Sequence, residues 1–155
     1  MDDGMFHYES CGLPNIRLRN GFTIKRTKYG EAVSIHNLEG LHRAIGLNLV
    51  NNKPTTLTAQ EVRFLRKEMD LPQVQLAALL DVSESTVRNW ESDDEARPGI
   101  TGPADRMLRT LYLEFVNKES KVRESLERIS HLNRNQYEQE CLEFTEEDGQ
   151  WLMAA

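Results

Sequence analysis

Two short helical segments separated by only three residues constrain the fold of this chain more than any other feature. The first segment follows Pro72, a residue tolerated in the first turn of a helix but not in its interior. Its apolar residues are Val74, Leu76, Ala77, Leu79 and Leu80. The second begins after Ser83, a favourable N-cap, and is expected to turn Val87 and Trp90 inward. So short a connection predicts two helices packed at a fixed angle.

Helical patterns flank this helix-turn-helix unit on both sides. Before it, Thr58 and Glu61 have the spacing of a capping box. The next residues form an apolar stripe with Val62, Leu65 and Met69, beside charged residues expected to point mostly outward, Arg63, Arg66 and Lys67. After it, a loop over 92–102 leads to Pro103, which opens a further helix. The apolar side of that helix consists of Met107, Leu108, Leu111, Tyr112, Phe115 and Val116.

The C-terminal part of the chain continues the helical spacing through a highly charged stretch. Val122, Leu126 and Ile129 recur at that spacing, and two interpretations stay open: a dimerisation seam, or a helix that packs within its own chain. Residues 133–155 are acidic, with irregularly spaced apolar residues, and indicate a short strand or a tail.

Residues 6–50 have a different pattern, with turn residues between short extended runs. The runs 16–18, 22–24 and 32–35 are typical of strands, and Asn20-Gly21 between the first two favours a hairpin there. Leu38 to Leu49 then follow a helical period. A polar stretch with Pro54 indicates a short linker.

These patterns predict a mainly α chain with a small N-terminal β-hairpin or sheet, which places it in the α+β class. The helices are expected to form a helix-turn-helix bundle of four to five members. We divide the chain into a partner-binding domain over 1–53, a helix-turn-helix domain over 55–117, and a helical extension with an acidic tail over 118–155.

Charge and composition exclude several classes. The net charge of −6 argues against a non-specific nucleic-acid coat, but it is unevenly distributed: +2 over residues 1–54, −3 over 55–113 and −5 over 114–155. Two cysteines fit a reduced, cytoplasmic protein rather than a disulfide framework. The acidic start does not resemble a secretory leader, and the longest apolar run, Leu76–Leu80, is far too short for a membrane helix.

The run from Leu71 to Glu91 resembles the Cro/XRE-type helix-turn-helix, whose members typically read L-S-Q-x-x-L-A-x-L-L-G-V-S-x-x-T-V-x-x-W-E. This chain reads L-P-Q-V-Q-L-A-A-L-L-D-V-S-E-S-T-V-R-N-W-E. It departs at Pro72, where serine is usual, and at Asp81, where glycine suits a left-handed turn. The chain is also similar to the C-terminal half of MqsA- and HigA-type antitoxins. That similarity implies a transcriptional repressor that pairs with a toxin protein.

The resemblance places the second helix of the unit in the major groove of DNA. Its outward residues are Glu84, Ser85, Arg88 and Asn89. Ser85 and Asn89 lie one turn apart on one face and match positions that commonly contact bases in the family. An asparagine can pair with adenine, and an arginine with guanine or phosphate. Glu84 can accept from cytosine but also repels phosphates.

Backbone contacts complete the candidate DNA site. Gln73 matches the family position that donates to a phosphate, and Ser83 and Thr86 are candidates for further backbone contacts. Six further basic residues could add positive surface beside this site, although a residue of this kind is more often simply a solvated charge. They are Arg63, Arg66, Lys67, Arg97, Arg106 and Arg109.

The sequence contains no strong pattern of metal ligands or of catalytic residues. His7, Cys11, His36 and His42 could be combined into a zinc site, but the paired C-x-x-C motifs of MqsA-like antitoxins are absent from this sequence. Cys11 has no evident orienting group that would make it a nucleophile. We therefore predict no enzyme, no metal and no cofactor.

The leading hypothesis is a sequence-specific, dimeric DNA-binding transcription regulator that reads a palindromic operator through its third helix. It would be a repressor, and an autoregulating antitoxin is the specific form that the resemblance implies. Its partners would be double-stranded DNA and a second copy of the chain, with no membrane. The basic N-terminal domain would bind a toxin protein or, alternatively, contact flanking DNA. The alternative is a protein-interaction adaptor whose helix-turn-helix no longer binds DNA.

Overall fold

The computed structural model describes residues 4–132, 134–139 and 141–154. In chain order its elements are β1 (Phe6–His7), β2 (Arg17–Leu18), β3 (Phe22–Thr27), β4 (Gly30–Ile35), α1 (Leu38–Asn52), α2 (Ala59–Glu68), α3 (Gln73–Leu80), α4 (Glu84–Trp90), α5 (Gly102–Val116), α6 (Lys121–Ser130), α7 (Arg134–Gln139), β5 (Phe144–Glu147) and β6 (Gln150–Met153). The predicted α+β class is confirmed: helices dominate, and the described strands form three separate antiparallel pairs.

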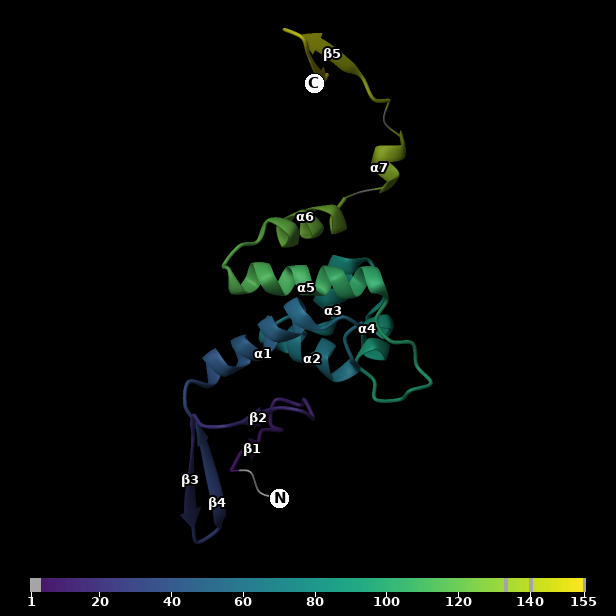
Figure 1. Ribbon diagram of the computed structural model, residues 1–155. Helices are drawn as coiled ribbons and strands as arrows, with labels where there is room; N and C mark the ends of the chain where they lie inside the picture. Colours follow the sequence, from purple (N-terminus) through teal and green to yellow (C-terminus); the bar gives the residue numbers. More distant parts are fainter. Residues whose placement is uncertain (1–3, 133, 140, 155) are drawn as a thin grey trace.

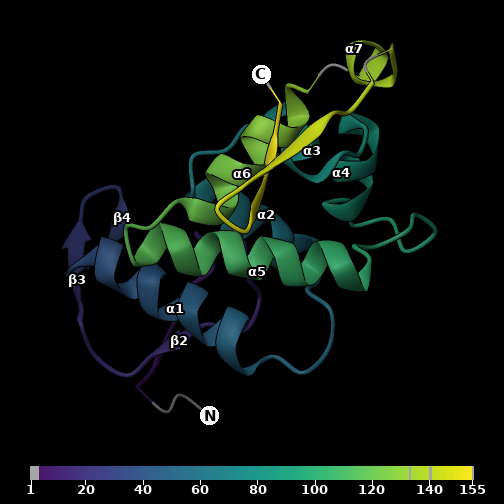
Figure 2. The same ribbon diagram turned by 90° about the horizontal axis from the view of Figure 1, so that it is seen from above.

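The helices form the body of the molecule, and the strand pairs lie at its edges (Figure 1). The long helix α5 crosses the bundle, with α1 beside it and α6 returning over its other side (Figures 1 and 2). The innermost apolar side chains come from α2, α3, α4 and α5: Val62, Leu65, Leu76, Val87 and Leu108. The helical spacing read from the sequence thus converges on one shared core.

Local sequence explains where the central helices begin and turn. Thr58 accepts from the Glu61 amide while the Glu61 carboxylate accepts from the Thr58 amide, so the predicted capping box is present. Asp81 has a φ of 54°, the left-handed conformation that ends α3 and redirects the chain into α4. Ser83 then accepts from the Thr86 amide and caps α4.

α1 packs on the helix-turn-helix bundle rather than standing apart from it. An added Cβ on Gly46 would lie 2.0 Å from the Tyr112 hydroxyl, so the two helices meet where α1 has no side chain. Arg109 of α5 also donates to the carbonyls of Lys53 and Thr55, at 2.9 and 2.8 Å. The polar stretch after α1, predicted as a linker, is thereby held against α5.

A second connection joins the N-terminal segment to the bundle. Tyr8 is buried, and its hydroxyl oxygen lies 2.8 Å from Nε2 of His42, whose Nδ1 lies 2.8 Å from a Glu68 oxygen. His42 can donate from Nδ1 to the carboxylate and accept a hydrogen bond from the tyrosine hydroxyl at Nε2. Burial raises the pKa of Tyr8, and the nearby Cys11 and Glu68 raise it further.

The N-terminal hairpin forms at a different turn from the one predicted. β3 pairs with β4 from Phe22↔Ile35 to Thr27↔Gly30, so the turn lies at Lys28-Tyr29, whereas Asn20-Gly21 joins β2 to β3 without pairing them. The predicted hairpin was wrong because the preceding strand is only two residues long. Six residues on each side of Lys28-Tyr29 offer a longer ladder of backbone hydrogen bonds.

The C-terminal region turns back at the end of α5. Lys118 adopts a φ of 57° there, and α6 packs against α3 and α5. Val122 and Leu126 contact the core, whereas Ile129 is 58% exposed. Val122 and Leu126 therefore belong to a helix face that packs within its own chain, the second of the two interpretations of this stretch. Beyond α7, β5 and β6 form an exposed hairpin at the end of the molecule opposite β3 and β4 (Figure 1).

Candidate nucleic-acid interface

α4 is held by its apolar side and presents its polar side outward. Val87 and Trp90 are buried in the core, whereas Glu84, Ser85 and Arg88 are exposed and Asn89 is half-buried. The separation into inward and outward residues agrees with the one predicted from helical spacing. A short, anchored helix with an exposed polar row has the form required to enter a DNA major groove.

Arg88 contacts two other residues of the row. Its guanidinium lies 3.2 Å from the Glu84 carboxylate and donates to the Ser85 hydroxyl at 2.9 Å. Glu84 therefore faces a positive charge on its own helix, which offsets the repulsion it would exert on a phosphate. Because exposed ion pairs of this kind contribute about 0–1 kcal/mol, Arg88 can exchange these contacts for DNA at little cost.

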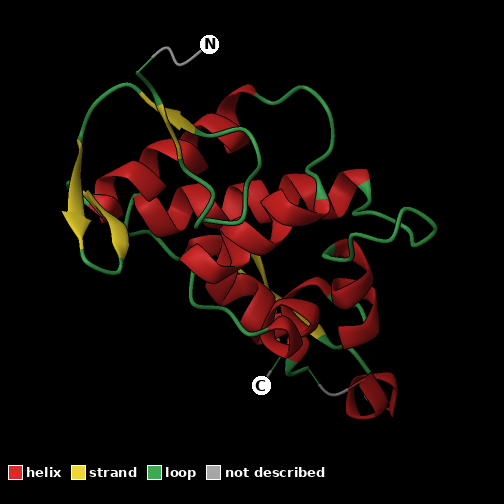
Figure 3. Cartoon of the chain, turned by 90° about the horizontal axis from the view of Figure 1, so that it is seen from below, coloured by secondary structure: helices red, strands yellow, loops and turns green. Residues whose placement is uncertain are grey.

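Asn89 is contacted by a residue from the loop that follows α4. Arg97 donates from Nη1 to the Asn89 side-chain oxygen at 2.9 Å and also lies 3.7 Å from Asp94. The loop extends outward beyond α4 (Figures 1 and 3). Arg97 was one of several basic candidates in the sequence, but its pairing with Asn89 joins a helix to an irregular loop, and no periodic pattern predicts such a contact.

Gln73, Ser83 and Thr86 lie where the two helices begin. Gln73 is the first residue of α3 and donates through Nε2 to a Glu91 oxygen at 3.3 Å. The Ser83 and Thr86 hydroxyls lie 2.8 Å apart at the start of α4, and Ser83 also serves as its N-cap. All three contact neighbouring residues, so their hydrogen bonds position the helix ends. Their contact with DNA stays a prediction.

An ion pair next to the C-terminal end of α4 was not predicted from the sequence. Glu91 is buried and accepts two hydrogen bonds from Arg66, and the Glu91 carbonyl accepts another from Arg63. The expectation that Arg66 points outward was therefore wrong. Its charged group satisfies Glu91, a carboxylate that would be costly to bury alone.

The other basic candidates divide into inward and outward residues. Arg109 lies mostly buried against Asp105 at 2.7 Å, and its guanidinium donates to the carbonyls of Lys53 and Thr55. Lys67 and Arg106 are exposed. The positive surface beside α4 thus depends on few residues, in agreement with the negative charge of this region.

The residues considered for zinc lie in separate interactions. His7 lies 2.8 Å from the Pro14 carbonyl, His36 lies 2.8 Å from the Thr23 hydroxyl, and His42 joins Tyr8 to Glu68. Among residues 4–132, 134–139 and 141–154, no three metal-binding side chains come together.

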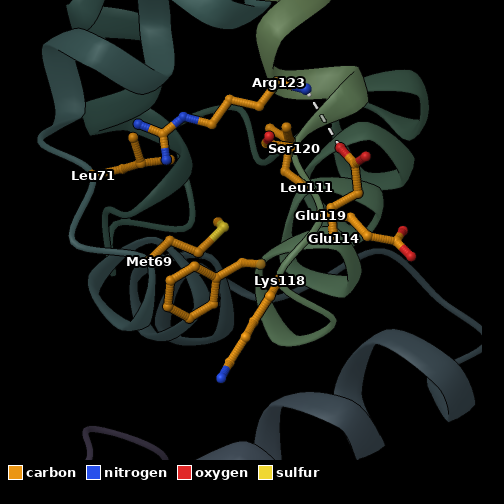
Figure 4. Close-up of a pocket in the computed structure, with 9 residues that line it drawn as sticks. Met69, Leu71, Leu111, Glu114, Lys118, Glu119, Ser120 and Arg123 are labelled. Carbon is orange, nitrogen blue, oxygen red and sulfur yellow. Dashed lines mark hydrogen bonds between the residues drawn. The ribbon is translucent and has the colours of Figure 1, made fainter.

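A pocket of about 260 Å³ lies away from the polar row, between the α2–α3 turn, α5 and α6 (Figure 4). Met69, Leu71 and Leu111 form apolar parts of its wall, and Lys118 and Arg123 contribute charged groups. Glu114 at its side accepts from the backbone amides of Val122 and Arg123, so this carboxylate caps the start of α6. The pocket includes none of the predicted DNA-binding residues.

Comparison with known proteins finds one similarity, in the centre of the chain. Residues 62–101 match the model of a family described as helix-turn-helix, a Cro/C1-type unit, which covers most of α2, all of α3 and α4, and the loop with Arg97. No curated protein and no solved structure matches the chain. The likeness to MqsA- and HigA-type antitoxins stays a prediction. None of the helices in the described part is long and apolar enough to cross a membrane.

Proposed function

We propose that this protein is a sequence-specific DNA-binding transcription regulator that reads base pairs through α4. The observation that carries the proposal is the polar row of α4: Ser85, Arg88 and Asn89 lie outward on a helix whose Val87 and Trp90 are buried. The match of residues 62–101 to a helix-turn-helix family supports it. The side chains of the row are those that pair with base edges in the major groove.

The charge of the protein determines the form of its binding. With −6 overall, the chain lacks the basic surface that gives tight non-specific affinity. We therefore expect specific affinity to come from a few placed contacts, from Asn89 and Arg88 to bases and from Gln73, Ser83 and Thr86 to phosphates. Non-specific binding is expected to be weak.

We also propose that the protein acts as a repressor and binds a palindromic operator as a dimer, one recognition helix in each half-site. Binding to DNA upstream of its own gene would support autoregulation. The antitoxin role implied by the resemblance has a separate test. A small basic protein encoded beside this gene should form a complex with this chain when the two are co-expressed.

Selection from a randomised duplex library, followed by fluorescence anisotropy on the enriched site and a scrambled duplex, tests the proposal. Wild-type protein should enrich a two-fold symmetric sequence. Asn89→Ala should bind that site about 10- to 100-fold more weakly while leaving binding to the scrambled duplex unchanged. Asn135→Ala, the same change on exposed α7, is the matched control and should bind like wild type. Failure to enrich any sequence would instead support the adaptor function.

A further inference from the structure

The two exposed hairpins at the ends of the molecule have opposite charges. Residues 22–35, which contain β3 and β4, carry three basic residues and one acidic residue, a net charge of +2. Residues 141–154, which contain β5 and β6, carry four acidic residues and no basic one, a net charge of −4. The helical body separates them (Figure 1), so they do not meet within one chain.

The acidic hairpin has an apolar face without a partner among the described elements. The pairs Phe144↔Met153 and Glu146↔Trp151 lie on the same face, because side chains alternate along each strand. Trp151 is 69% exposed and Met153 is 65% exposed. An isolated two-stranded hairpin is marginally stable in water, and a covering layer would stabilise it.

The basic hairpin has a similar face. The pairs Ile24↔Val33 and Arg26↔Glu31 share it, and Ile24 is 49% exposed. Its base is anchored, since the ring of Phe22 lies 5.3 Å from that of Phe6. The outer part, towards the turn, is the part that is free to bind.

The two faces share one order of charged and apolar residues. Counting from the turn, the acidic hairpin offers Glu146 with Trp151 and then an apolar pair, and the basic hairpin offers Arg26 with Glu31, 3.6 Å apart, and then the apolar pair Ile24 and Val33. If the hairpins stack with their turns together, the first strand of each lies over the second strand of the other, so the Arg26 guanidinium lies over the Trp151 ring, which attracts it. Glu31 then lies at the level of Glu146, so the attraction between the hairpins comes from their total charges rather than from this one pair. The apolar pairs then cover one another.

We propose that the acidic hairpin of one chain docks on the basic hairpin of a second copy, and that two such contacts form a two-fold symmetric dimer. Charge selects this pairing, because two acidic hairpins or two basic hairpins would repel each other. Symmetry uses the contact twice and doubles the surface buried. The inference deepens the dimer of the proposed function, but it is tested without DNA, so its failure leaves sequence-specific binding untouched.

Charge reversal followed by mixing tests the proposal. Sedimentation equilibrium should show a wild-type dimer whose association weakens as salt is raised. Lys25→Glu/Arg26→Glu changes the charge of residues 22–35 from +2 to −2, and Glu146→Lys/Glu147→Lys changes that of the paired strands and turn over 144–153 from −3 to +1. Each variant then carries two hairpins of like charge and alone should associate at least about tenfold more weakly. An equimolar mixture of the two should form a heterodimer, because each contact then joins opposite charges. A chain carrying all four reversals should dimerise again.

Matched variants separate this contact from an effect of net charge. Lys67→Glu/Arg106→Glu and Glu95→Lys/Glu119→Lys make the same charge changes at exposed positions outside the hairpins. They should associate like wild type, and circular dichroism should show all variants folded. A monomeric wild type, reversals no more damaging than these controls, or a mixture that fails to form heterodimers would each overturn the proposal.

Discussion

Arg66 and Glu91 form a bidentate ion pair that joins α2 to the residue directly after α4. Arg66 donates from Nε to Oε2 at 2.6 Å and from Nη2 to Oε1 at 2.7 Å, and the two side chains are 11% and 2% exposed. Two parallel charge-assisted hydrogen bonds determine orientation as well as distance. The C-terminal end of the candidate recognition helix is therefore held in place by a buried contact with α2.

We expect Glu91→Ala to lower the free energy of unfolding by about 3 kcal/mol, because it leaves the Arg66 guanidinium largely buried without a counter-ion. Urea unfolding near neutral pH measures this loss. Glu84→Ala removes the exposed carboxylate beside Arg88 and should cost less than about 1 kcal/mol. Equal losses in the two variants would show that burial does not distinguish these ion pairs.

The meeting of α1 and α5 gives a second prediction. Alanine favours a helix over glycine by about 1 kcal/mol, yet Gly46→Ala should destabilise the protein by about 1–3 kcal/mol. The new methyl group would lie 2.0 Å from the Tyr112 hydroxyl, so the two helices would have to separate. Gly102→Ala is the matched control, because a Cβ there contacts nothing within 4 Å. Thermal unfolding should show a lower Tm for Gly46→Ala alone.

Tyr112 makes stability depend on alkaline pH. Burial, with a further contribution from Glu68, raises its pKa to about 12, although Arg43 acts in the opposite direction. The unfolded chain releases this proton near pH 10, before the folded chain does, so stability is complete below pH 10 and falls above it. The loss from this residue should reach about 1.4 kcal/mol at pH 11.

Urea unfolding at pH 9, 10 and 11 tests this dependence. Tyr112→Phe should flatten the decline in the free energy of unfolding, and Tyr29→Phe, which alters a side chain that is 89% exposed, should not. The flattening should be partial, because burial also raises the pKa of Tyr8. A decline as steep in Tyr112→Phe as in wild type would contradict the assignment.

Short-range patterns predicted the parts of the fold that depend on neighbouring residues. The capping box at Thr58, the N-cap at Ser83 and the left-handed turn at Asp81 each depend on residues within a few positions. The inward and outward faces of α4 followed from helical spacing for the same reason.

Contacts between distant residues were not predictable in this way. Arg66 was expected to be exposed because its partner, Glu91, lies 25 positions further along the chain. The hairpin at Lys28-Tyr29 was missed because strand length outweighed the local preference of Asn20-Gly21 for a turn. The first error comes from a partner that is distant in the sequence, and the second from competition between two possible turns.

The contact between Arg97 and Asn89 leads to the last prediction. An asparagine needs both its oxygen and its nitrogen to pair with adenine, and Arg97 occupies the oxygen in the free protein. On binding, we expect Arg97 to leave Asn89 and contact a phosphate. Arg97→Ala should therefore weaken binding to specific and scrambled duplexes by a similar factor. It should also make the negative slope of log affinity against log salt concentration shallower by about 1.

Anisotropy titrations at several salt concentrations distinguish this role from one in base reading. Arg128→Ala removes one positive charge from exposed α6 and should leave the salt slope unchanged, so it controls for net charge. If Arg97→Ala weakened only the specific complex with no change in slope, Arg97 would act by orienting Asn89 in the complex. The unchanged slope would then exclude a phosphate contact, because losing one such contact must reduce the number of counterions released.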